Sequence, residues 1–161
     1  VLYSVTMVGS IGGGWFPMYF IKKGYQPYDG RMRAMFVIAL FPLVVLAAQP
    51  LGHISSFWIP VILIGIGASA HQAWSANIFT TVSDMFPKKA VASVVGIGGM
   101  AGGLGGVAIS KIGGAVFDHY EKLGHIQTGY TIMFTFCAVA YVIAWLIMKS
   151  LVPKYKPITD L

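Results

Sequence analysis

The chain has 161 residues, of which 57% are hydrophobic and 10% are charged, and its mean hydropathy is +0.75. Soluble domains carry about 25% charged residues, so this chain has too few charges to cover a surface that faces water. The composition therefore excludes an ordinary soluble enzyme, a disordered chain and a nucleic-acid-binding module, and it indicates a membrane protein. The single cysteine, Cys137, excludes a disulfide scaffold.

Five stretches of the chain are apolar enough to cross a bilayer as helices, which takes about 20 residues each. In chain order they are Val1–Phe20, Ala34–Leu51, Phe57–Phe79, Val91–Phe117 and Tyr130–Met148. They do not alternate polar and apolar residues as the strands of a membrane barrel do. Helices also satisfy the backbone hydrogen bonds inside lipid. The sequence thus predicts an all-α membrane protein with five transmembrane helices.

The charged residues between these stretches predict how the helices are oriented. Nine of the eleven Lys and Arg residues lie in residues 21–33, in residues 80–90 and in the tail from residue 149. Because basic residues mark the cytoplasmic side of a membrane, the C-terminus is expected in the cytoplasm. The five acidic residues are all expected in connectors or in the tail: Asp29, Asp84, Asp118, Glu121 and Asp160. The net charge of +6 is then explained by topology, and no nucleic-acid partner is expected.

The third stretch carries the richest polar cluster, in residues 70–77. His71, Trp74 and Ser75 share one helical face, whereas Asn77 lies on a different face from His71. Gln72, Ser75 and Asn77 are added to the candidate site for their polarity. Such groups cost several kcal/mol if they meet lipid without partners, so they are expected to face protein or a water-filled cavity. An indole suits the flat face of a sugar ring, and the other groups can hydrogen-bond hydroxyls and a carboxylate. The alternative is that these residues only join helices by hydrogen bonds.

The fourth stretch is rich in glycine, and G-x-x-x-G steps let helices approach closely. We expect helix packing through Gly98, Gly102, Gly103 and Gly106. The same segment also fits a G-x-G-x-x-A dinucleotide pattern, but that pattern needs a strand before a helix in a soluble fold. No spacing typical of metal ligands and no nucleophile–base pair is present in a suitable context. The sequence therefore predicts no cofactor, no metal site and no enzyme.

Residues 70–103 carry a resemblance to a known family. They begin Ala-His-Gln-Ala-Trp-Ser-Ala-Asn and end Gly-Ile-Gly-Gly-Met-Ala-Gly-Gly, and they resemble the tenth and eleventh helices of bacterial hexuronate transporters. These transporters form part of the anion:cation symporter branch of the major facilitator superfamily. Gly12-Gly-Gly-Trp-Phe-Pro17 and Gly30-Arg-Met-Arg33 resemble the eighth helix and the loop after it.

The resemblance implies that the chain is the C-terminal half of such a transporter without its first helix. It implies proton-coupled uptake of hexuronates such as glucuronate and galacturonate by alternating access, in a bacterial inner membrane. The partner would be the N-terminal half, which would carry the proton-coupling carboxylates. By position, the resemblance nominates His71, Trp74 and Gly99 for substrate binding. The alternatives are a transporter of another sugar acid, such as galactonate or glucarate, and a non-transporting membrane subunit.

Overall fold

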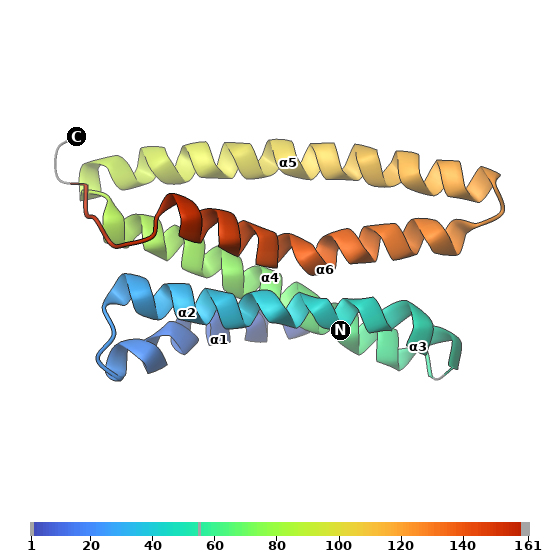
Figure 1. Ribbon diagram of the computed structural model, residues 1–161, viewed down its shortest axis with the longest axis horizontal. Coiled ribbons are helices and arrows are strands. Elements are labelled where there is room, and N and C mark those ends of the chain that lie inside the picture. Colours follow the sequence, from blue (N-terminus) through green and yellow to red (C-terminus); the bar gives the residue numbers. More distant parts are fainter. Residues whose placement is uncertain (1, 55, 159–161) are drawn as a thin grey trace.

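The computed structural model describes residues 2–54 and 56–158, and all the regular secondary structure in this part of the chain is helical. Its elements are α1 (Leu2–Lys22), α2 (Pro27–Leu40), the 3₁₀ segment η1 (Phe41–Ala47), α3 (Ala48–Ile54), α4 (Trp58–Met85), α5 (Lys88–Lys122) and α6 (Ile126–Leu151). Figure 1 shows the helices running along one long axis. The α1–α2 turn, the α4–α5 turn and the C-terminal segment lie at the same end, which we call the basic end because nine of the eleven Lys and Arg residues lie there.

Four segments of the described chain are long and apolar enough to cross a membrane. They are Pro27–Gly52, which joins α2, η1 and most of α3, and the helices α4, α5 and α6. The expectation of five such spans is therefore confirmed for four of them. The first expected span does form a helix, α1, with 21 residues, but it is not among the four. Its four glycines and its Ser and Thr residues lower its hydropathy.

The helices extend further than the apolar stretches of the sequence. Helix α5 has 35 residues, which at 1.5 Å per residue is about 52 Å, whereas the hydrocarbon core is about 30 Å thick. The acidic residues expected in connectors are therefore mostly helical: Asp29 is in α2, Asp84 in α4, and Asp118 and Glu121 in α5. That expectation was wrong for these four, because hydropathy marks the lipid-facing part of a helix and not its polar ends. Asp160 lies outside the described residues.

The second span is not a uniform α-helix. Pro42 lacks a backbone N–H, so the α-helical hydrogen bond to Ile38 cannot form at that position. The preceding residue, Phe41, bonds Ile38 O in the tighter i→i+3 pattern, and the 3₁₀ segment η1 continues to Ala47. Neighbouring helices cover this segment, and Pro42 and Val45 are buried.

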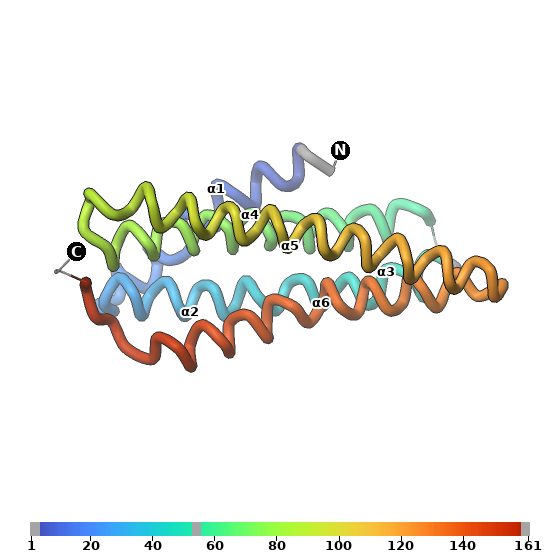
Figure 2. Tube along the Cα trace, turned by 90° about the horizontal axis from the view of Figure 1, so that it is seen from above, coloured from blue at the N-terminus to red at the C-terminus, as the bar shows by residue number. Residues whose placement is uncertain are grey.

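Helices α1 and α4 form the closest contact in the described structure. A Cβ added at Gly9 would lie 2.3 Å from Ser69 O, and one added at Gly13 would lie 2.4 Å from Ala73 Cα. Gly9 and Gly13 are a G-x-x-x-G step, and Ser69 and Ala73 repeat the same spacing on α4, so the two backbones can meet. Figure 2 shows α1 inclined to the other helices, so that its N-terminal part diverges from them.

Helix α5 lies at the opposite edge of the bundle (Figure 1). No residue of its apolar window is buried within the described structure. A Cβ added at any of the four glycines expected to pack, Gly98, Gly102, Gly103 and Gly106, would have no neighbour within 4 Å. Nearer its C-terminal end α5 does contact α6, where Gly113 approaches Met133 and Phe117 approaches Gly129. Within the described chain, the glycine face of α5 is therefore open.

Candidate functional site

His71 and Trp74 meet the same residue of another helix, Tyr141 of α6. Nδ1 of His71 shares a hydrogen bond with the Tyr141 hydroxyl. The Trp74 ring packs edge-on against the Tyr141 ring, with 5.5 Å between centroids and 70° between planes. The i, i+3 spacing on α4 is what lets one tyrosine contact both side chains. The three residues, which we call the α4–α6 aromatic cluster, bind the middle of α4 to α6.

A cavity of about 390 Å³ opens beside this cluster, between η1, α4, α5 and α6. His71, Cys137 and Tyr141 are among the residues that line it, and its wall is almost entirely apolar. Ile109 of α5 and Pro42 of η1 form part of the apolar remainder. His71 is itself exposed, so its imidazole is accessible to a ligand even while one ring nitrogen is hydrogen-bonded to Tyr141.

Trp74 is placed differently from His71. Its side chain is 5% exposed and belongs to the buried core, together with Met35, Ile38, Ala39, Ala70 and Ala73. A ring enclosed in this way has little open face on which a sugar could stack. In this conformation the contacts of Trp74 support the packing of α4 against α2 and α6.

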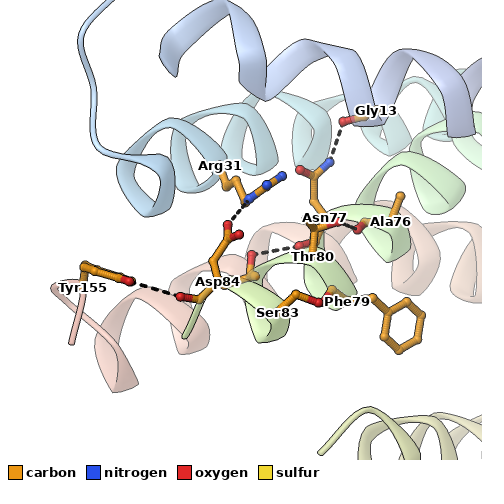
Figure 3. Close-up of polar contacts among 10 residues, drawn as sticks. Gly13, Arg31, Ala76, Asn77, Phe79, Thr80, Ser83, Asp84 and Tyr155 are labelled. Atoms are coloured by element: carbon orange, nitrogen blue, oxygen red, sulfur yellow. Dashed lines mark hydrogen bonds and ion pairs between the residues drawn. The ribbon is translucent and has the colours of Figure 1, made fainter. Parts of the chain in front are cut away.

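Asn77 faces α1, on the other side of α4 from His71. Its Nδ2 donates to Gly13 O at 2.8 Å and to Ala73 O at 2.9 Å, and Figure 3 shows the bond that crosses to α1. The side chain is 1% exposed, and its Oδ1 is buried without a hydrogen-bond partner within the described structure. The structure therefore does not bring Asn77 together with His71.

Gln72 and Ser75 are polar residues of α4 whose side chains make no hydrogen bond in the described structure. Gln72 is exposed and Ser75 is half-buried. Ser69 also belongs to α4, but its hydroxyl donates to Val5 O at 2.8 Å. Neither Gln72 nor Ser75 has a hydrogen-bond partner in residues 2–54 and 56–158. An amide that meets lipid in this state is costly, so the side of α4 that carries Gln72 is expected to face water or another protein surface.

Gly99 lies on α5, and a Cβ added there would have no neighbour within 4 Å in the described part of the chain. Its backbone is thus open on the side where a side chain would project. Among the described residues, no three His, Cys, Asp or Glu side chains come close enough to hold a metal ion.

A second polar cluster lies at the basic end, and the sequence did not indicate it. Arg31 Nε donates to Asp84 Oδ2 at 2.6 Å, which ties α2 to the end of α4 (Figure 3). The C-terminal segment crosses this point: the Tyr155 hydroxyl donates to Asp84 O at 3.1 Å, and Ile158 N donates to Met85 O at 2.9 Å. The Tyr28 hydroxyl also bonds Val152 O. The tail therefore crosses the ends of α2 and α4.

Some contacts that were not predicted from the sequence nevertheless have a recognisable sequence pattern, and others have none. The G-x-x-x-G step of Gly9 and Gly13 was readable in the sequence. Tyr141 was a weaker signal, a hydroxyl in an otherwise apolar stretch. Nothing in the sequence pairs Arg31 with Asp84, since 53 positions separate them.

The curated proteins that the chain matches are two hexuronate transporters. The chain is 27% identical over 111 residues to the hexuronate transporters of Escherichia coli strains K12 and O157:H7, and the match covers 69% of this chain. It spans 25% of the length of those relatives. No family model matches the chain, and no solved structure matches it. The chain is thus a helical membrane protein with distant, partial similarity to a transporter of the major facilitator superfamily, as the resemblance in residues 70–103 predicted.

Proposed function

We propose that this chain forms part of a secondary transporter that carries a hexuronate, such as glucuronate or galacturonate, together with protons. The relatives that it matches are transporters and not enzymes. The observation that carries the proposal is the polar, exposed part of α4. Gln72 has no partner in the described structure, and His71 lies at a cavity of about 390 Å³. A purely structural helix surface in lipid has no reason to keep an unpaired amide and an accessible imidazole on an apolar span.

In the proposed transporter, α1, the second span and α4 to α6 correspond to helices eight to twelve. The basic end faces the cytoplasm, because basic residues accumulate on that side. Substrate would bind where the exposed side of α4 and the Gly99 region of α5 meet the half of the transporter that this chain does not contain. Gln72 and His71 would hydrogen-bond the hydroxyls and the carboxylate of the sugar acid.

The remaining residues of the α4 cluster take supporting roles in this proposal. Tyr141 orients the His71 imidazole, since a hydrogen bond to one ring nitrogen determines which tautomer the other presents. Trp74 holds Tyr141 in place from the core. Asn77 joins α4 to α1. No described helix carries an acidic residue in its central part, so the proton-coupling acids are proposed to lie in the other half.

The test is uptake of radiolabelled glucuronate by vesicles that contain the full-length transporter. Gln72→Leu removes the uncommitted amide and is expected to lower kcat/KM at least about tenfold, the effect of losing one hydrogen bond to a polar substrate. Ser83→Ala is the matched control, because Ser83 is an exposed polar residue of α4 whose hydroxyl bonds Phe79 O in its own helix. It is expected to leave uptake unchanged.

Two outcomes would contradict the proposal. Normal uptake by Gln72→Leu would remove the exposed side of α4 from the substrate path. Absence of flux for every sugar acid in vesicles that hold correctly folded protein would favour a non-transporting membrane subunit. Competition by galactonate and glucarate in the same assay determines which sugar acid is carried.

A further inference from the structure

The turn between α1 and α2 carries a compact array of aromatic and basic side chains. Tyr19 and Phe20 pack edge-on with 5.5 Å between ring centroids, and Phe20 packs in the same way against Tyr25 at 6.4 Å. The Lys23 ammonium lies 4.3 Å from the centroid of the Tyr19 ring, and the Arg33 guanidinium lies 4.3 Å from that of Tyr25. We call these five residues the α1–α2 turn cluster. They form one continuous series of contacts from α1 to α2.

Local contacts hold the backbone of this turn in one conformation. Gly24 has a φ of +94°, a conformation that glycine adopts without strain, and its N–H donates to Ile21 O at 2.9 Å. A Cβ added at Gly30 would lie 2.9 Å from Ile21 Cγ1, so the first turn of α2 packs directly on the end of α1. The rings and the cations are therefore held by a fixed backbone and not by a free loop.

Lys23 and Arg33 have no acidic partner among the described residues. In the described residues the structure contains an ion pair between Arg31 and Asp84, and neither Lys23 nor Arg33 donates a side-chain hydrogen bond to the protein. A cation over an aromatic ring is oriented by the ring, yet it keeps N–H groups directed away from that ring. Both side chains are exposed. Two ordered cations thus present unused donors at one end of a membrane-spanning bundle.

The position of the cluster identifies the anion. Tyr19 and Tyr25 are 46% and 39% exposed, and tyrosines exposed at the end of a membrane span lie at the level of the headgroups. Basic residues beside them attract anionic lipids, and this attraction falls off within a Debye length. The cluster has no enclosing loop and no buried polar group, which a site for a free soluble anion would need to hold it. The anion available at this depth is the phosphate of a phospholipid.

We propose that the α1–α2 turn cluster is a binding site for an anionic phospholipid, with Lys23 and Arg33 bonding the headgroup phosphates and Tyr19 and Tyr25 lying against the glycerol region. This site is independent of the transported substrate. It anchors the C-terminal end of α1, opposite the N-terminal part that diverges from the other helices.

The test measures lipid retained by the full-length protein, purified in detergent at about 0.15 M salt, where charges separated by more than about 8 Å are largely screened. Phosphatidylglycerol and phosphatidylcholine are titrated separately, and bound lipid is counted by native mass spectrometry. The variant Lys23→Gln/Arg33→Gln is expected to weaken phosphatidylglycerol binding about tenfold or more. Phosphatidylcholine binding is expected to stay weak in every variant.

The matched control is Lys88→Gln/Lys89→Gln, which also removes two positive charges from the basic end. Lys88 and Lys89 are exposed and lie over no aromatic ring among the described residues, so this variant is expected to change lipid binding less than about twofold. Tyr19→Leu/Tyr25→Leu keeps both cations and is expected to weaken binding by about fivefold, since it removes two cation–π contacts. Lys23→Arg/Arg33→Lys preserves charge and is expected to retain binding, which separates loss of the site from loss of folding.

Three results would contradict the proposal of a phospholipid site. Equal loss in the two charge-removal variants would mean that the lipid responds to the whole basic end. Unchanged binding by Lys23→Gln/Arg33→Gln would mean that the cluster binds no lipid. Displacement of phosphatidylglycerol by inorganic phosphate at an equal concentration would mean that the cluster binds a free anion.

Discussion

Helices α1 and α5 both carry small residues at four-residue spacing, but in the described structure only those of α1 pack against another helix. Gly9 and Gly13 let the backbone of α1 approach Ser69 and Ala73 of α4 so closely that a Cβ has no space. Gly98 and Gly102 of α5 have no neighbour within 4 Å of where a Cβ would lie in the described structure. A G-x-x-x-G step therefore permits close packing, and the opposing surface determines whether packing occurs.

The largest expected effect on stability is at Gly13. In Gly13→Leu the new side chain starts 2.4 Å from Ala73 Cα, and a backbone atom cannot move aside without separating α1 from α4. We expect a loss of about 3 kcal/mol or more, at the upper end of the cost of overpacking. Gly12→Leu is the control, because a Cβ at Gly12 has no neighbour within 4 Å. Thermal unfolding of the full-length protein in detergent measures both, and equal melting temperatures would contradict the α1–α4 packing.

A smaller effect is expected at Asn77, which adds a hydrogen bond to the same interface. Asn77→Ala removes the bonds to Gly13 O and Ala73 O, but it also removes the buried Oδ1 that has no partner in the described chain. Because the second change offsets part of the first, we expect a loss of about 1 kcal/mol, within the range of hydrogen bonds between membrane helices.

Thr80→Val is the control for that measurement. The Thr80 hydroxyl donates to Ala76 O at 2.6 Å within α4, so the variant removes a hydrogen bond that joins no helices. A loss as large as that of Asn77→Ala would show that the bond to Gly13 contributes nothing specific to the α1–α4 contact. Unfolding free energies of the full-length protein provide the comparison.

The helical architecture could be predicted from the sequence because the mean hydropathy of about 20 residues distinguishes a segment that lies in lipid from one that lies in water. The prediction failed at the helix ends, as at Asp84 and Asp118, since a helix that leaves the hydrocarbon stays helical while its composition becomes polar. It also did not anticipate the 3₁₀ segment that follows Pro42, which depends on how neighbouring helices cover the unpaired backbone.

For the candidate site, the sequence identified polar residues but not their neighbours. His71, Gln72 and Asn77 stand out on an apolar span, yet they point toward α6, toward the exterior and toward α1. Those directions follow from which helices surround α4, and helix neighbours are set by contacts between residues far apart in the chain. Tyr141 illustrates this, since its contact with His71 spans 70 positions.

The smallest expected effect on stability is at Gly102, and it decides what the open face of α5 is for. In the described structure a Cβ added at Gly102 has no neighbour within 4 Å, so Gly102→Leu is not expected to lower the unfolding free energy by more than about 0.5 kcal/mol, as for other exposed positions. If the glycine face slides against the other half of the transporter during alternating access, the same variant abolishes glucuronate uptake. Leu104→Ile is the control, because Leu104 is already 66% exposed and keeps its volume. Normal uptake by Gly102→Leu would mean that the glycine face of α5 faces lipid. Helix α1 would then be a helix packed through its glycines, and α5 a helix whose glycines face lipid.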